Sequence, residues 1–591
     1  MKWKGRYEHY NKEAFRKDII SGFIVGIIAI PLGMAFAISS GVKPEYGIYT
    51  TVIAGILISL FGGSRFQIGG PTGAFIPILL SIVLQYGYDN LLIAGFLAGV
   101  ILILMGIFKI GTLIQFIPKP LTIGFTSGIA VIIFTGQIVN FLGLQNIEKH
   151  EEFILNMFEI GVHLKTINIY SLVTSLICLF TILISPKIFP RIPGSLVGLI
   201  ISSYIAFNMF NGEVPTIKST FGNIPNSLPA FHLLEMDWGK IRTLLGPAFV
   251  IAMLGGIESL FSAVVADGMT GKRHNSNREL VGQGIANVIT PLFGGIPATG
   301  AIARTATNIK NGAVSPISGI IHGFVVLLVL LLFAPFASQI PLASMAPILM
   351  IVAWNMSERK EFIQILKTKT SDAIIMTTTF LLTIFLNLTT AIVVGLILAV
   401  IIFVKRMSEL LTVTKVLPNH SVKHQKLMAH IVSDERDCPQ ISIYTIDGPL
   451  FFGTANMLEK SIMNTASTQS EILLLRIGKV PFIDTTGEAK LASIVKYFKR
   501  HDSVILFSGI QTQPKELLKR TGLYDFIGHH NFFEHSGEAI AYALTQINFN
   551  KCLGCKHYAF LECSILSQAN KPLLNLKDYK GIKQIDTDIS N

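Results

Sequence analysis

Apolar runs of membrane-spanning length alternate with short polar segments up to about residue 406. Fourteen such runs lie at 18–36, 46–61, 73–86, 90–108, 120–143, 168–185, 195–210, 244–265, 279–293, 301–310, 314–333, 341–356, 372–388 and 390–404. A helix needs about 20 apolar residues to cross a bilayer, so the short runs at 73–86 and 301–310 cannot cross alone. The pattern predicts a polytopic α-helical membrane protein with 14 spans.

The pattern changes after Arg406. Short β-branched runs at 441–446, 472–477, 504–507 and 532–533 alternate with helix-like segments near 454–466, 487–500, 514–521 and 537–547. Alternating strand and helix signals are typical of a small α/β domain. We therefore expect a cytoplasmic N-terminal segment at 1–17, a transmembrane domain at 18–408, an α/β domain at 409–548 and a Cys-containing tail at 549–591.

Composition agrees with a membrane protein and excludes an ordinary soluble enzyme over most of the length. The 591 residues are 51% hydrophobic and 14% charged, with a mean hydropathy of +0.57. The formal net charge of +12 could suggest nucleic acid, but Lys and Arg lie in loops between apolar runs rather than in one stripe. We expect no nucleic-acid partner, and no enzyme, because no nucleophile–base set or phosphate loop is present.

The loop charges predict the topology. Lys and Arg gather in alternate loops, whereas the opposite side receives the Glu-rich loop 145–165 and the polar loop 211–242. The positive-inside rule then puts both termini in the cytoplasm. The charged N-terminus shows no cleavable signal, so the first span is expected to target the chain to the inner (plasma) membrane as a multi-pass protein.

A Gly- and Pro-containing break occurs twice inside apolar surroundings. The first copy includes Gly69-Gly70-Pro71-Thr72-Gly73-Ala74, and the second is the stretch 292–301, which contains Pro297-Ala298-Thr299-Gly300-Ala301. Paired breaks in the two halves of a transporter indicate its central binding site. Seven spans in each half would invert the second copy, so that two helix N-termini meet near the midplane and offer unpaired N–H groups to an anion.

Two ionisable residues lie within apolar spans beside the second copy. Glu258 is mid-span, Arg304 is one turn into the helix that begins near Gly300, and Ser262 follows Glu258 by one turn. A charge at membrane depth costs roughly 2.5–3.5 kcal/mol, so each needs a partner or a cavity. One interpretation is a Glu258–Arg304 pair that only joins two helices. The other makes Arg304 an anion-attracting group and Glu258 a proton acceptor or part of a cation site.

Two features of the C-terminal third are open to more than one interpretation. The turn Asp484-Thr485-Thr486-Gly487 leads into a helix, where Asp and Thr are good N-caps and a hydroxyl could be phosphorylated. Cys552, Cys555, His557 and Cys563 could hold zinc or an iron–sulfur cluster, form a reducible thiol pair, or be surface thiols without a defined role. No other cofactor is expected to be required.

The order of these features resembles the SulP family of sulfate permeases and related anion transporters, with a C-terminal STAS domain. The residues that carry the resemblance are 30–37, 69–74, Glu258 with Ala266-Asp267, 287–307 and 484–487. The resemblance implies a 7+7 inverted repeat, a core domain that moves against a gate domain, a homodimer, and substrate between the third and tenth helices. It places the anion near Thr72, Gly73, Ala74, Gly300, Ala301 and Arg304, and ion coupling at Glu258 and Ser262. We expect Phe75 and Ile302 to belong to the anion site as well.

The chain also departs from the family pattern. Leu32 stands where many members have Gln, and Glu258 stands where members that use sodium often have Asp. Thr486 matches the phosphorylated position of STAS-type regulators, which implies a cytoplasmic STAS-binding protein. We expect proton-coupled uptake of a small inorganic anion, sulfate first. The alternatives are sodium-coupled bicarbonate uptake, and a channel or exchanger for chloride or dicarboxylates that its STAS domain regulates.

Overall fold

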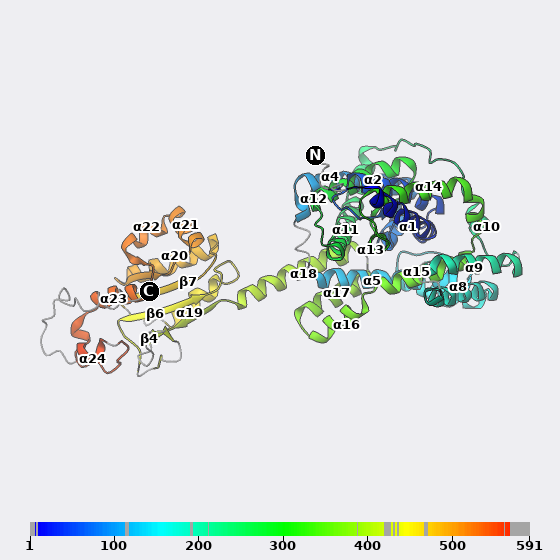
Figure 1. The fold of residues 1–591 in the computed structure, drawn as a ribbon. Coiled ribbons are helices and arrows are strands. Elements are labelled where there is room, and N and C mark those ends of the chain that lie inside the picture. Colours follow the sequence, from blue (N-terminus) through cyan, green and yellow to red (C-terminus); the bar gives the residue numbers. More distant parts are fainter. Residues whose placement is uncertain are drawn as a thin grey trace. The chain divides into compact units, whose positions relative to one another are not determined.

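The chain forms two compact units, Met1–Ala399 and Val400–Asn591, here called the membrane unit and the C-terminal unit (Figure 1). The computed structural model describes residues 6, 10–112, 118–188, 193–210, 212–386, 388–418, 427–428, 432–433, 436–465, 471–560 and 562–567. Each unit is described by itself. Of the predicted N-terminal segment and Cys tail, residues 1–5, 7–9, 561 and 568–591 lie outside the described part.

The membrane unit is built from helices. They are α1 (Lys12–Ser39), α2 (Pro44–Phe61), η2 (Gly73–Phe75) with α3 (Ile76–Tyr86), α4 (Tyr88–Ile107), α5 (Lys119–Gly136), α6 (Ile138–Leu142), α7 (Phe153–Val162), α8 (Ile169–Ile188), α9 (Gly194–Met209), α10 (Ile217–Phe221), α11 (Trp238–Thr270), α12 (Ser276–Ile289), α13 (Ile302–Lys310), α14 (Ile317–Ser338), α15 (Leu342–Met356), α16 (Arg359–Thr368), α17 (Ser371–Phe385) and α18 (Leu388–Glu409). Each of the 14 predicted apolar runs coincides with one or two of these helices. In the described residues, eight helices are long and apolar enough to cross a membrane, so the count of 14 spans stays a prediction.

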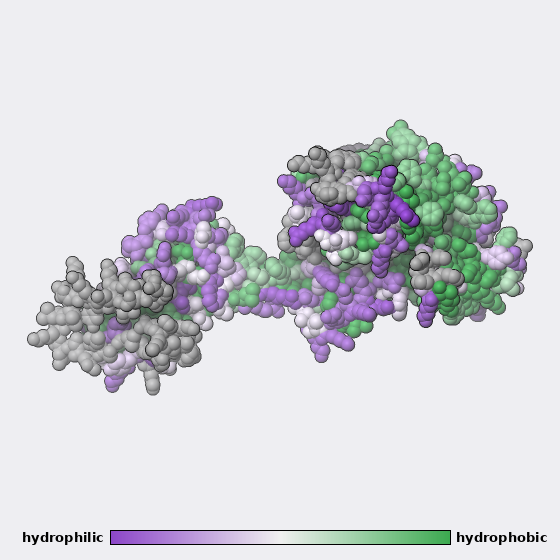
Figure 2. Space-filling model, viewed as in Figure 1, coloured by the Kyte–Doolittle hydropathy of each residue, from purple (hydrophilic) through white to green (hydrophobic). Residues whose placement is uncertain are grey.

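The outer surface of this unit is apolar. Figure 2 shows hydrophobic residues covering the face over α8, α9 and α14. Exposed side chains on these helices include Phe180, Leu183, Tyr204, Phe207, Phe324 and Leu332. Large apolar side chains facing outward on several neighbouring helices are what a lipid environment requires.

Helices from the two halves of the unit pack closely. α4 lies against α11 and α12, α1 against α14, and α5 against α17. At the α4–α12 contact a Cβ added to Gly99 would lie 2.6 Å from the backbone nitrogen of Val288. Small residues let helix backbones approach in membranes, and this approach brings α11 and α12 to the first break.

The two breaks pair directly. Strand β1 (Gly69–Gly70) is antiparallel to β2 (Thr299–Gly300), with Gly69 opposite Gly300 and Gly70 opposite Thr299. The first strand leads into η2 and α3, and the second leads into α13. Two segments 230 residues apart thus share one short sheet inside the helical unit.

The C-terminal unit contains a five-stranded sheet in the order β3-β6-β7-β8-β9. Its strands are β3 (Thr412–Lys415), β6 (Ile441–Asp447), β7 (Ile472–Lys479), β8 (Val504–Ser508) and β9 (Phe532–Phe533), and a separate pair joins β4 (Leu417–Pro418) to β5 (Leu427–Met428). β3 is antiparallel to β6, whereas β6 to β9 are parallel. The helices are α19 (Ala455–Thr465), α20 (Thr485–Arg500), α21 (Thr512–Arg520), α22 (Leu523–Ile527), α23 (Ser536–Thr545) and α24 (Cys563–Leu566).

Side chains alternate between the two faces of this sheet, as strand geometry requires. In β6, Tyr444 and Ile446 join the core beneath α19 to α22, whereas Ile441 and Ile443 join the core beneath α23. Ala559 and Phe560 are buried in that second core. The boundary that the sequence suggests at 548/549 therefore divides segments that pack into one core.

Candidate functional site at the paired helix starts

The two helix starts beside β1 and β2 are not capped by side chains. Thr72 precedes η2 and Ala301 precedes α13, and neither makes a side-chain capping bond. Ala301 instead donates its N–H to the carbonyl oxygen of Ile68 at 2.9 Å, which holds the second start beside the first strand. First-turn N–H groups that no cap satisfies are ready donors for an anion.

Helices α11 and α12 hold the second break in place. Ser259 of α11 accepts the N–H of Gly300 at 3.0 Å, and its hydroxyl lies 2.8 Å from that of Thr299. Asn287 of α12 makes two 2.8 Å bonds to the backbone N–H and carbonyl of Ala298. Sequence reasoning did not single out Ser259 or Asn287, although polar residues within apolar helices were a usable signal.

Arg304 is buried, with 3% of its surface exposed, and reaches from α13 to the first break. Its Nη2 donates to the carbonyl oxygen of Pro71. Its Nη1 is buried and has no hydrogen-bond partner among the described residues. A buried cationic donor left unpaired is costly, so this nitrogen is the group in the site best suited to an anionic ligand.

Glu258 also contacts the first break. It is half-buried, and its Oε2 accepts a hydrogen bond from the Thr72 hydroxyl at 3.0 Å. Among the described residues no ion pair joins Glu258 to Arg304, and each is tied instead to the residues around Pro71. The two side chains are therefore linked through the first break and not by a direct ion pair, and both interpretations of their role stay predictions.

The other predicted site residues lie close to this centre. Ser262 does not bond to Glu258, since its hydroxyl donates to Thr305 of α13 at 3.3 Å. Thr305 in turn accepts the N–H of Ile68 at 3.0 Å. Phe75 is buried against Gly255 of α11, and Ile302 is half-buried at the start of α13. Ser262 thus helps to join α11, α13 and the first strand, and its role in coupling stays a prediction.

Gly300 occupies a position without room for a larger residue, and Gly73 occupies a tight one. A Cβ on Gly73 would lie 3.0 Å from Met356 Sδ, which packs beside the first helix start. A Cβ on Gly300 would lie 1.5 Å from Nε2 of Gln67, whose side chain is buried and donates to the carbonyl of Ser259 at 3.1 Å. Ala74 and Ala301 are also buried here. The small residues of the two breaks allow their backbones to approach each other.

The turn at 484–487 has a defined structural role. Asp484 accepts the N–H of Gly487 at 2.7 Å as the N-cap of α20, and its second oxygen accepts the N–H of Phe452 at 3.0 Å. Thr485 and Thr486 are exposed. Capping explains Asp484, and phosphorylation of the exposed hydroxyls stays a prediction.

The cysteines are all free thiols. Among the described residues no three His, Cys, Asp or Glu side chains are positioned to hold a metal ion, so the metal site predicted at Cys552, Cys555, His557 and Cys563 stays a prediction. Burial raises the pKa of the Cys552 and Cys563 thiols. It also raises the pKa of Cys438 to about 11, although backbone amides of Gln440 and Ile441 act in the opposite direction.

Comparison with known proteins assigns both units. The model of the sulfate permease family matches residues 15–379, and the model of the STAS domain matches residues 435–539. The chain belongs to the sulfate permease family. This confirms the resemblance stated above and the architecture of a polytopic anion-transporter domain followed by a STAS domain.

Individual relatives cover nearly the whole chain. YvdB of Bacillus subtilis (strain 168), a protein named for sulfate transport, is 55% identical over 538 residues, which are 91% of this chain and 99% of YvdB. The bicarbonate transporter BicA of Picosynechococcus is 28% identical over 547 residues, covering 87% and 92% of the two chains. The solved structure of SLC26A9 has a TM-score of 0.81 at 16% identity over 94% and 93%, which shows a shared fold.

Proposed function

We propose that this protein carries out secondary active uptake of a small inorganic anion, with sulfate as the first candidate. The supporting observation is the buried, unpaired Nη1 of Arg304 beside two helix starts that no side chain caps. A guanidinium with one nitrogen already fixed presents its remaining donors in a defined direction, and oxyanions match that geometry. The anion would bind between η2 and α13.

Glu258 is proposed as the coupling group for a proton. Its carboxylate accepts a hydrogen bond from the hydroxyl of Thr72. Thr72 directly precedes the helix start at which the anion would bind. A substrate that changes the orientation of Thr72 would therefore change the hydrogen bonding of Glu258. Loading a proton on Glu258 would neutralise its charge while the site moves between the two sides of the membrane, which lowers the cost of that movement.

The test measures accumulation of labelled sulfate in proteoliposomes under an imposed proton gradient. We expect Glu258→Gln to abolish accumulation and to spare sulfate–sulfate exchange, because the neutral amide can still bond to Thr72 but cannot cycle a proton. Glu13→Gln is the control, since Glu13 is an exposed residue at the start of α1. Normal accumulation by Glu258→Gln would overturn the coupling role.

Sodium-coupled bicarbonate uptake is the second candidate, and the similarity to the bicarbonate transporter BicA supports its substrate. A competition panel of sulfate, bicarbonate, chloride, nitrate and dicarboxylates against labelled sulfate separates the substrates. Acceleration by sodium without dependence on the proton gradient would favour this candidate. Anion current without accumulation would instead indicate the channel or exchanger alternative.

The remaining proposals concern assembly and location. We infer a multi-pass protein of the inner membrane with both termini in the cytoplasm, working as a homodimer and without any enzymatic step.

The exposed Thr486 would be a phosphorylation site that controls binding of a cytoplasmic partner to the STAS domain. Chemical crosslinking in native membranes and phosphopeptide mass spectrometry test the dimer and the modification.

A further inference from the structure

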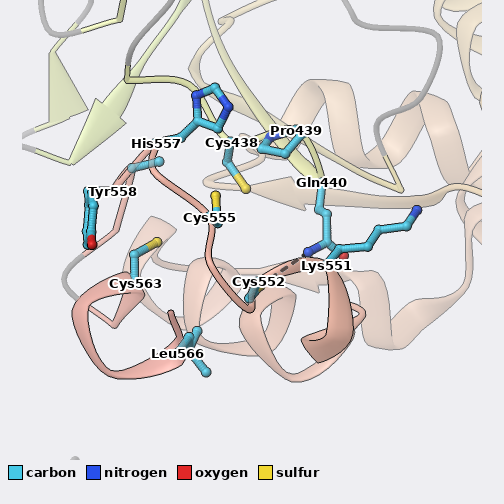
Figure 3. Close-up of a pocket in the computed structure, with 11 residues that line it drawn as sticks. Cys438, Pro439, Gln440, Lys551, Cys552, Cys555, His557, Tyr558, Cys563 and Leu566 are labelled. Carbon is cyan, nitrogen blue, oxygen red and sulfur yellow. Dashed lines mark hydrogen bonds between the residues drawn. The ribbon is translucent and has the colours of Figure 1, made fainter. Parts of the chain in front are cut away.

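Cys438 lies beside the Cys-containing tail, although more than 110 residues separate it from Cys552. Figure 3 shows a pocket in the C-terminal unit that is lined by Cys438, Cys552, Cys555, His557 and Cys563. Cys438 comes from the segment that enters β6, and the other thiols come from the tail. The tertiary structure thus gathers four thiols, where the sequence alone indicated three.

The tail is held at this place by specific contacts. Gln440 accepts the N–H of Asn548 at 2.8 Å through Oε1 and donates to the carbonyl of Asn548 at 3.2 Å through Nε2. Lys551 forms an ion pair with Glu471, and Phe560 is buried in the core beneath α23. The tail segment that carries these thiols is therefore packed into the C-terminal unit.

Two of the four sulfurs already have donors of the kind that metal-bound thiolates need. Gln440 Nε2 donates to Cys552 Sγ at 3.3 Å, and the N–H of Phe560 donates to Cys563 Sγ at 3.4 Å. The Nδ1 of His557 is buried without a hydrogen-bond partner among the described residues. N–H donors to sulfur stabilise thiolate ligands and tune their metal.

We propose that Cys438, Cys552, Cys555 and Cys563 bind one thiophilic divalent ion, of which zinc is the model. Four thiolates in a tetrahedral arrangement are a standard structural zinc site. The thiols do not yet converge on one point in the described structure. Binding therefore requires side-chain rotation about Cα–Cβ bonds and releases the thiol protons.

The size of the pocket favours a single ion over an iron–sulfur cluster. Its volume is about 20 Å³, which is close to the space that one water molecule needs. A bound ion would join the segment before β6 to the tail. It would therefore stabilise the folded C-terminal unit by an amount that rises with the logarithm of its affinity, because the folded unit binds the ion more tightly than the unfolded chain does.

The first test uses the full-length, reduced, metal-free protein in detergent. Added Co²⁺ is expected to give sulfur-to-cobalt charge-transfer absorption and the visible bands of a tetrahedral site, saturating at one ion per chain, and Zn²⁺ should displace it. Zn²⁺ should also protect Cys438, Cys552, Cys555 and Cys563 from alkylation, as mass spectrometry would show. Absence of both the thiolate bands and the protection in the wild-type chain overturns the proposal.

Variants identify the ligands. Cys438→Ser should weaken zinc binding at least about tenfold, since even loss of an outer partner costs that much. Cys178→Ser is the matched control, because this buried thiol lies in α8 and donates to the carbonyl of Ser344. Unchanged zinc affinity and an unchanged cobalt spectrum in Cys438→Ser would overturn the assignment of four thiol ligands. Loss of metal binding in His557→Ala would also overturn it, because His557 is not one of the proposed ligands. Detection of iron and acid-labile sulfide in anaerobically purified protein would overturn the proposal that the site binds a single ion.

Discussion

Arg304 holds the two breaks together and still has a donor to spare. The Nη2 of its guanidinium donates to the carbonyl oxygen of Pro71, and its Nη1 is buried and unpaired among the described residues. Lysine could supply the charge at this place but not two donors in a fixed plane. The geometry of the guanidinium, in addition to its charge, should therefore matter for the anion.

We predict that Arg304→Lys raises the KM for sulfate about tenfold or more. Loss of one hydrogen bond to a charged group costs about 1.5–3 kcal/mol, and about 1.4 kcal/mol corresponds to a factor of ten. Uptake kinetics in proteoliposomes measure the change. Lys310→Ala is the control, because this exposed cation lies on the same helix. An unchanged KM in Arg304→Lys would contradict a geometric role.

Gly300 is required by the close approach of Gln67. We predict that Gly300→Ala abolishes transport, because the added Cβ would overlap the Gln67 side chain and separate β2 from β1. The double variant Gly300→Ala/Gln67→Ala removes the clash and should recover part of the activity. Gly268→Ala, at an open position of α11, should leave uptake unchanged. Equal activity of Gly300→Ala and wild type would contradict this packing explanation.

At the scale of elements, helix ends decide what each segment can do. The helix starts at Thr72 and Ala301 have no side-chain cap and follow the paired strands β1 and β2, whereas the start of α20 is capped by Asp484. An uncapped start can accept a ligand, and a capped start is stabilised internally. The same type of helix terminus thus serves binding in one unit and stability in the other.

We predict that Asp484→Ala destabilises α20 by about 1 kcal/mol, the usual cost of losing an N-cap. Thr486→Ala, in the first turn of the same helix, should change the stability by no more than about 0.5 kcal/mol because its side chain is exposed. Hydrogen exchange of the α20 amides in the full-length protein measures both. Faster exchange in Thr486→Ala than in Asp484→Ala would contradict the assignment of the cap.

At the scale of the whole molecule, topology should follow the loop charges. In a background without native cysteines, a cysteine at Glu148 should react with an impermeant maleimide in intact cells. A cysteine at Lys272 should react only after the membrane is permeabilised, because its loop is rich in Lys and Arg. The reverse pattern would show that both termini lie outside.

Features that depend on local pattern could be predicted from the chain alone. Apolar length predicted the helices, the change of period after Arg406 predicted the α/β unit, and the cost of charge in an apolar span singled out Glu258 and Arg304. The repeated Gly and Pro residues located both breaks, since these residues interrupt a helix wherever the chain folds. The family comparison confirms the class of protein that these patterns predicted.

Which distant segments meet became clear from the three-dimensional packing. Glu258 and Arg304 each bond to the first break instead of pairing with each other, and Ser262 bonds to Thr305. Cys438 lies with the tail cysteines, which spacing along the chain could not reveal. The physical reason is that local periodicity encodes which face of an element is buried. Contacts between residues more than 100 positions apart depend instead on how closely packed backbones satisfy their remaining hydrogen bonds.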